Sequence, residues 1–102
     1  MPFINSDVSK VRRYLGYQVT ADHHAFILGR LAEVERISES EVSIAQACIR
    51  ELDSIMNQMG NAKNPHELRS QGKRLVNELS IQLGIAVRED IFAANNHRVI
   101  RG

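Results

Sequence analysis

Apolar residues at helical spacing, interrupted by clear start and stop signals, constrain the fold of this chain most strongly. In four stretches they recur at steps of three and four residues, which places them on one face of an α-helix. Thr20 and Ser40 are suited to cap helix starts, and Asn64-Pro65-His66-Glu67 combines a cap, a proline at the first helical position and a glutamate that can reach back. Gly84 is a stop signal. The pattern predicts an all-α chain.

We expect helices over residues 7–15, 21–37, 41–59 and 65–83, give or take a residue or two. Asn5 or Ser6 is the expected cap of the first helix. Gly72 lies inside the fourth helix, where it either permits a close helix crossing or has no structural role. The positions expected to face the core are Val8, Val11, Leu15, Phe26, Ile27, Leu31, Val34, Ile37, Val42, Ala45, Cys48, Ile49, Leu52, Ile55, Met56, Met59, Leu68, Leu75, Val76, Leu79 and Leu83.

The last 18 residues, 85–102, follow the stop at Gly84 and differ from the rest. They are too apolar for an ordinary disordered tail and too irregular for another amphipathic helix. Residues 85–87 alternate as a short strand would. The sequence therefore predicts a small four-helix bundle, residues 1–84, with an extended C-terminal docking arm, residues 85–102, that works by binding neighbouring proteins.

Composition excludes several classes of function. A chain of 102 residues forms one domain, its 25% of charged residues is ordinary, and a net charge of +1 implies no general attraction to polyanions. No secretion signal and no stretch of roughly 20 apolar residues are present, so no membrane association is expected. Cys48 is the single cysteine, which excludes an intrachain disulfide and fits a reducing compartment.

Charge is distributed unevenly along the chain. Residues 1–16 carry a net charge of +2, residues 20–53 carry −4 and residues 61–102 carry +3. An acidic middle with basic ends would suit head-to-tail stacking of identical subunits. The alternative interpretation is that these charges only solvate the outer faces of the helices.

No group of residues predicts catalysis, a metal site or a cofactor. His23 and His24 are adjacent on a helix and point about 100° apart, so one ion cannot easily bind both. Cys48 has apolar neighbours on its helical stripe and is expected to be a buried thiol.

Lys10, Arg12 and Arg13 on the first helix, with Lys73 and Arg74 on the fourth, could form a DNA-binding patch, and Arg12 and Arg13 are expected to be exposed. The sharpest turn in the chain, however, is flanked by glutamates that would repel phosphate.

Several segments together resemble the head–tail connector, or adaptor, proteins in the neck of tailed bacteriophages. They are Val11-Arg12-Arg13-Tyr14-Leu15-Gly16-Tyr17, Arg50-Glu51-Leu52-Asp53-Ser54-Ile55, the run from Arg69 to Leu79, Leu83-Gly84-Ile85 and Asp90-Ile91-Phe92. The resemblance spans roughly residues 8–92, although none of these motifs is diagnostic by itself.

The resemblance implies a structural subunit of the virion, made in the host cytoplasm. Such adaptors are helical, form a twelve-fold ring between the portal and the tail or stopper proteins, and lengthen the channel that genomic DNA passes in transient contact. Their extended C-terminal arm commonly reaches into the portal. The residues that would bind the portal here are four apolar anchors and two arginines, namely Ile91, Phe92, Val99, Ile100, Arg98 and Arg101.

Two other functions stay open on the sequence alone. A helical interaction or regulatory module would form a discrete dimer or heterodimer rather than a large ring. A small DNA-binding regulator would bind duplex DNA in a salt-sensitive way that depends on Arg12 and Arg13. Of the functions considered, enzymatic activity is the one that the residues support least.

Overall fold

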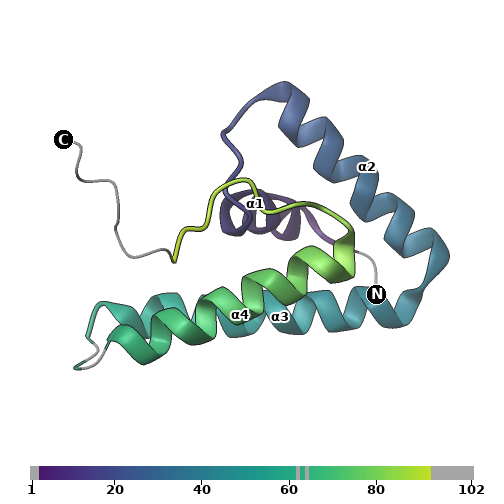
Figure 1. Ribbon diagram of the computed structural model, residues 1–102. Coiled ribbons are helices and arrows are strands. Elements are labelled where there is room, and N and C mark those ends of the chain that lie inside the picture. Colours follow the sequence, from purple (N-terminus) through teal and green to yellow (C-terminus); the bar gives the residue numbers. More distant parts are fainter. Residues whose placement is uncertain (1–2, 62, 64, 93–102) are drawn as a thin grey trace.

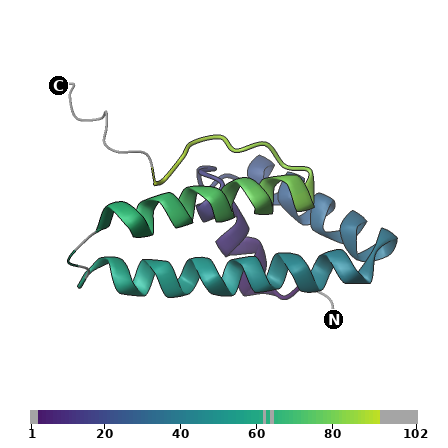
Figure 2. The same ribbon diagram turned by 60° about the horizontal axis from the view of Figure 1, so that its bottom comes forward.

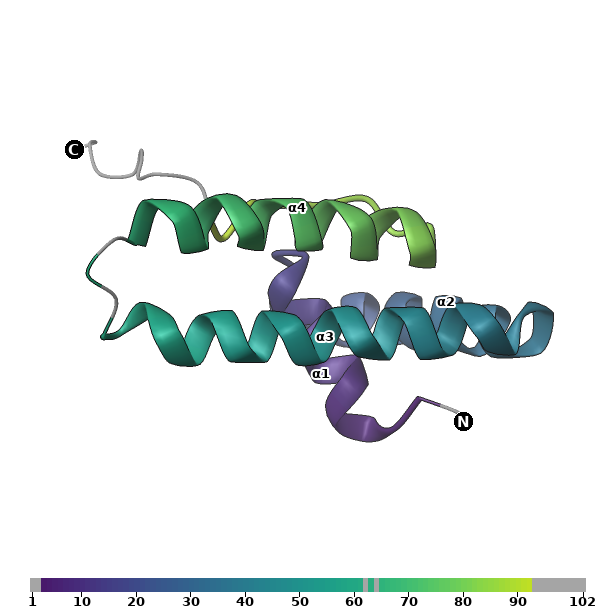
Figure 3. The same ribbon diagram turned by 90° about the horizontal axis from the view of Figure 1, so that it is seen from below.

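Two long antiparallel helices, α3 (Glu39–Met59) and α4 (Pro65–Leu83), form the base of the fold. The computed structural model describes residues 3–61, 63 and 65–92. α3 and α4 lie side by side over most of their length (Figures 2 and 3). Their pairing follows from the apolar stripes predicted for residues 41–59 and 65–83, each of which can be covered only by another apolar face.

α2 (Ala21–Ile37) joins α3 at a sharp turn and diverges from the α3–α4 pair (Figure 1). α1 (Asn5–Tyr14) and the segment that follows α4 lie in the space between α2 and that pair (Figure 1). The described part of the chain is thus an all-α bundle of four helices without a strand. None of its helices has the length and apolarity needed to cross a membrane.

The core is formed by side chains from all four helices and from the segment after α4. Its aliphatic and aromatic members are Val8, Val11, Tyr14, Leu15, Ile27, Leu31, Val34, Val42, Ala45, Cys48, Ile49, Leu52, Ile55, Val76, Leu79, Leu83, Ile85 and Phe92. Most of the predicted core positions are confirmed. Tyr14 was not among them, although its side chain is fully buried.

Three predicted core positions are wrong: Phe26, Ile37 and Met56 are exposed. On α2 and α3 the predicted apolar stripe is wider than the face that neighbouring elements cover. α2 is buried only along its line of Ile27, Leu31 and Val34, because it diverges from α3 and α4.

The starts of two helices differ from the prediction. α3 begins at Glu39, and its cap is Ser38, whose hydroxyl accepts the Glu41 backbone N–H at 3.3 Å, so Ser40 already lies in the helix. α1 is preceded by Ile4, whose backbone N–H is bound by the carboxylate of Asp7 at 3.0 Å. The side-chain hydrogen bond at the start of α1 therefore comes from Asp7, the third residue of the helix, and the predicted caps Asn5 and Ser6 already lie inside the helix.

The other predicted helix boundaries are confirmed, whereas the predicted Asn64 cap of α4 lies outside the described residues. The Thr20 side chain accepts the backbone N–H of His23 at 3.1 Å and caps α2. Gly16 and Gly84 follow α1 and α4 with φ of 82° and 67°, the left-handed conformation that glycine adopts without strain.

Candidate interaction surface

The chain does not leave the bundle at Gly84. Residues 84–92, the C-terminal strap, turn back along the helices instead (Figures 1 and 2). The turn is built by Ser80, whose backbone carbonyl accepts the N–H groups of Gly84 and Ile85 at 2.9 and 3.1 Å. Its hydroxyl donates to the Ile85 carbonyl at 2.6 Å. The first two bonds satisfy the Ser80 carbonyl, one of the four carbonyls without a helical partner at the end of α4, and the three bonds together fix the direction of the strap.

The middle of the strap is bonded to the end of α1. The backbone N–H groups of Arg88 and Glu89 both donate to the carbonyl of Leu15, at 2.8 and 3.3 Å. The Tyr17 hydroxyl donates to the carbonyl of Ala86 at 2.7 Å. The predicted strand over residues 85–87 is wrong, because this backbone bonds to Ser80 of α4 and to the Tyr17 side chain, and the described residues contain no strand with which it could pair.

Two glycines allow the strap to approach the helices closely. A Cβ atom on Gly16 would lie 2.2 Å from the Glu89 backbone oxygen, and one on Gly72 would lie 2.6 Å from the ring of Phe92. Gly72 thus permits a close approach, as one of its two predicted roles required, but the element that approaches it is the strap. An ion pair of 3.6 Å between Lys73 and Asp90 lies beside it.

Phe92, predicted as an anchor for the portal, is instead an anchor within its own chain. Its side chain is only 2% exposed and packs against α4 at Gly72, and its backbone N–H is bound by the Asp90 carboxylate at 2.9 Å. Ile91 is 38% exposed and faces outward. The docking arm predicted over residues 85–102 is therefore corrected for residues 85–92, because burying Ile85 and Phe92 in the same chain removes their apolar surface from water without a partner.

The other four predicted portal-binding residues lie outside the described residues. They are Arg98, Val99, Ile100 and Arg101. They belong to residues 93–102, the C-terminal tail, which begins directly after the anchored Phe92. Because Phe92 packs at Gly72, the tail starts beside the N-terminal half of α4.

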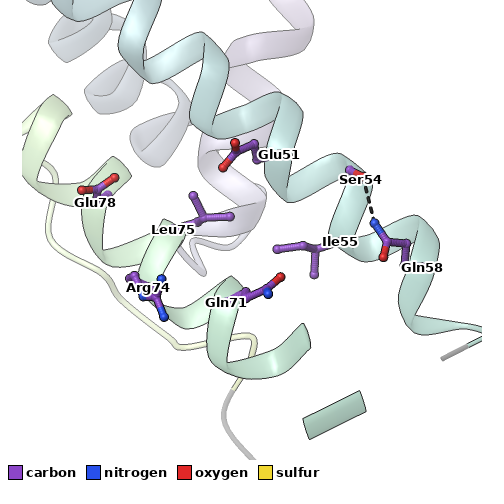
Figure 4. A pocket seen from close by; sticks show the side chains of 8 residues that line it. All are labelled: Glu51, Ser54, Ile55, Gln58, Gln71, Arg74, Leu75 and Glu78. Carbon is purple, nitrogen blue, oxygen red and sulfur yellow. Dashed lines mark hydrogen bonds between the residues drawn. The ribbon is translucent and has the colours of Figure 1, made fainter. Parts of the chain in front are cut away.

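A groove of about 550 Å³ runs between α3 and α4 (Figure 4). Ile55 and Leu75 face each other across it and form its apolar floor. Its other lining residues are polar or charged, namely Glu51, Ser54, Gln58, Gln71, Arg74 and Glu78. The groove was not predicted from the sequence, because it depends on which faces of two helices come together.

The charges of the groove are not neutralised within the described chain. No ion pair there joins Glu51, Arg74 or Glu78 to another residue. Burial raises the pKa of the nearby Cys48 thiol, and the negative charges of Glu78 and Glu51 raise it further. Cys48 is buried, as predicted, and a raised pKa disfavours the reactive thiolate.

On the other side of α3, a polar cluster joins it to α1. The Asp53 carboxylate accepts hydrogen bonds from the Tyr14 hydroxyl and from Lys10 Nζ, the latter at 2.7 Å. Burial and the bond to Asp53 raise the pKa of Tyr14 to about 12. Desolvation opposes the charged form of Asp53, but the bonds from Lys10 and Tyr14 outweigh it and lower its pKa. The cluster is an interhelical clamp rather than a reactive site.

The remaining candidates lie on α1 and at the start of α2. Arg12 is half-buried because it donates to the Tyr17 carbonyl at 2.9 Å, whereas Arg13 is exposed and lies over the Tyr14 ring at 5.4 Å. The ring of His23 bonds the Gln18 carbonyl at 2.9 Å. The described residues contain no group of three or more histidine, cysteine or acidic side chains that could hold a metal ion.

Comparisons with protein-family models, with characterised proteins and with solved structures found no match to this chain. The geometry described above is therefore the basis for assigning a function. Its two distinctive features are the strap that anchors the start of the tail and the charged groove between α3 and α4.

Proposed function

We propose that this chain is a structural subunit of a tailed-phage neck. In this role about a dozen copies form a ring between the portal and the tail or stopper proteins and extend the channel for DNA. The observation that carries the proposal is the strap, which binds the chain to the bundle as far as Phe92. The tail of residues 93–102 therefore starts from a fixed point, as a segment that reaches into a partner requires.

The composition of the tail supports a docking role. Val99 and Ile100 are β-branched apolar residues between Arg98 and Arg101. In a partner's groove the apolar pair would be buried, and the arginines would bind acidic groups in paired hydrogen bonds. In this revised form of the arm, the portal-binding residues are these four together with the outward-facing Ile91.

The uneven charge of the chain supports a ring. α2 and the first half of α3 are acidic, whereas α1 and the C-terminal region are basic. A ring joins two different faces of each subunit, and it would be favoured if the acidic residues of one copy met the basic residues of the next.

Quantitative mass spectrometry of purified particles of a virus that encodes this chain would test the proposal. We expect about a dozen copies per tailed particle. The double substitution Arg98→Glu with Arg101→Glu should remove the protein from the particles. The control variant Arg50→Glu with Lys63→Glu makes the same change in charge outside the tail, and this variant should remain in the particles. A protein that occurs only in infected-cell extract would refute the proposal.

The groove between α3 and α4 favours a second function, that of a helical protein–protein interaction module. Its apolar floor and unpaired charges are what a partner segment would recognise. A large ring in sedimentation of the purified protein would favour the neck subunit, whereas a dimer or a one-to-one complex with a partner protein would favour the module.

A further inference from the structure

The groove between α3 and α4 has a defined chemistry but no occupant among the described residues. Its floor is apolar, with Ile55 from α3 and Leu75 from α4 (Figure 4). The carboxylates of Glu51 and Glu78 lie one on each side of it, and Arg74 reduces the formal charge of the lining to −1. An occupant that matches this surface has short apolar side chains next to positive charge.

The C-terminal tail has that chemistry. Arg98-Val99-Ile100-Arg101 places two apolar side chains between two guanidinium groups. Val99 and Ile100 would bury apolar surface mainly against Leu75, since Ile55 is itself only 5% exposed, and each Å² buried is favourable by roughly 25 cal/mol. The two arginines would face carboxylates that have no ion pair within the described chain.

The tail also starts at a suitable place and has a suitable length. Phe92 packs at Gly72, and the α4 residues of the groove are at positions 71, 74, 75 and 78, in the same part of that helix. A helix with its side chains is about 11 Å across, so half its circumference is about 17 Å. About five extended residues span that length. Residues 93–97 therefore suffice to carry the chain around α4, and residues 98–101 then reach the groove.

We infer that residues 98–101 occupy the α3–α4 groove of the same molecule when no partner is bound. Because residues 93–97 connect the docking residues to the anchored Phe92, the docking is intramolecular and the tail has a high effective concentration at the groove. Docking covers the apolar side chains of the tail in the free protein, where they would otherwise promote aggregation. The inference concerns the isolated protein, so it does not rest on the proposed function.

Trypsin provides the test, because it cleaves after Arg98 and Arg101. The measurement is the rate of loss of residues 99–102 from the full-length folded protein, followed by intact mass. A synthetic peptide of residues 93–102 gives the rate for a free tail. We expect slower cleavage in the protein than in the peptide. Glu51→Gln with Glu78→Gln should accelerate cleavage in the protein by about two- to thirtyfold, the range for losing two exposed ion pairs.

Two further variants make the result specific. Asp22→Asn with Glu67→Gln removes the same charge from exposed first-turn positions outside the groove, and its cleavage rate should equal that of the wild type. Arg74→Gln removes the one cation of the groove and should slow cleavage. Circular dichroism of each variant confirms that the bundle is intact before rates are compared.

The inference is overturned if the wild-type tail is cleaved as fast as the peptide, or if the variant at Glu51 and Glu78 is cleaved no faster than the wild type. It is also overturned if protection is lost on about a hundredfold dilution, which would place the tail in the groove of a second copy. None of these results depends on virus particles. A negative result in the trypsin experiment would therefore refute the docking inference without refuting the ring proposal, which the particle measurement tests.

Discussion

Gly72 is the residue whose role is most sharply defined by its neighbours. Inside a helix, glycine is usually about 1 kcal/mol less favourable than alanine. Here a Cβ atom would lie 2.6 Å from the Phe92 ring. We expect Gly72→Ala to lower the free energy of unfolding, because overpacking of about 1–3 kcal/mol outweighs the gain in helix propensity. Urea unfolding followed by circular dichroism measures the change.

Gly29 supplies the matched control. It lies in α2 and has no atom within 4 Å of an added Cβ. Gly29→Ala should therefore raise the free energy of unfolding by up to about 1 kcal/mol. In a Phe92→Ala background, Gly72→Ala should become stabilising as well. A destabilising effect that persists there would show that the Phe92 ring is not the cause.

Tyr14 is expected to give the protein a distinctive alkaline behaviour. Its pKa is raised to about 12 in the folded state, against about 10 in the unfolded chain. Between these values the unfolded chain has lost a proton that the folded protein keeps. The contribution of Tyr14 to stability is therefore complete below about pH 10 and is lost as the pH rises towards 12.

An ultraviolet titration of tyrosinate tests this expectation. One tyrosine should ionise only near pH 12, and that step should vanish in Tyr14→Phe and persist in Tyr17→Phe. The Tyr14→Phe variant should also be less stable at neutral pH by about 1 kcal/mol, because it loses the hydrogen bond to Asp53. A wild-type titration without a step near pH 12 would contradict the clamp.

At the scale of helices, the turn between α2 and α3 depends on one cap. Ser38 accepts the Glu41 N–H, whereas Ser40, the cap predicted from the sequence, lies inside α3. Ser38→Ala should lower the free energy of unfolding by about 1 kcal/mol. Ser40→Ala should change it by less than about 0.5 kcal/mol, since it is an exposed helical position. A reversed order of the two effects would restore the boundary predicted from sequence.

At the scale of the whole molecule, truncations separate the strap from the tail. Removing residues 93–102 should cost less than about 1 kcal/mol, because it deletes no member of the core formed by the described residues, whose last member is Phe92. Removing residues 85–102 deletes Ile85 and Phe92 from the core and should cost roughly 3–6 kcal/mol. Equal melting temperatures for the two truncations would show that the strap contributes nothing to the bundle.

Helix positions followed from the sequence because their causes are local. The cap at Thr20, the proline at the start of α4 and the stops at Gly16 and Gly84 act over one turn of chain, and the structure has them as predicted. The all-α class followed from apolar spacing for the same reason. The sequence also predicted that residues 85–92 need burial, but not what would bury them.

The tertiary structure alone decided which surface covers each apolar face. Residues 85–92 look like a partner-binding arm in sequence because nothing local shows that the end of α1 and Gly72 of α4 will lie beneath them. The α3–α4 groove likewise depends on the relative rotation of two helices that are each amphipathic alone. Capping and periodicity are short-range interactions and can be read along the chain, whereas burial and charge pairing depend on residues that only folding brings together.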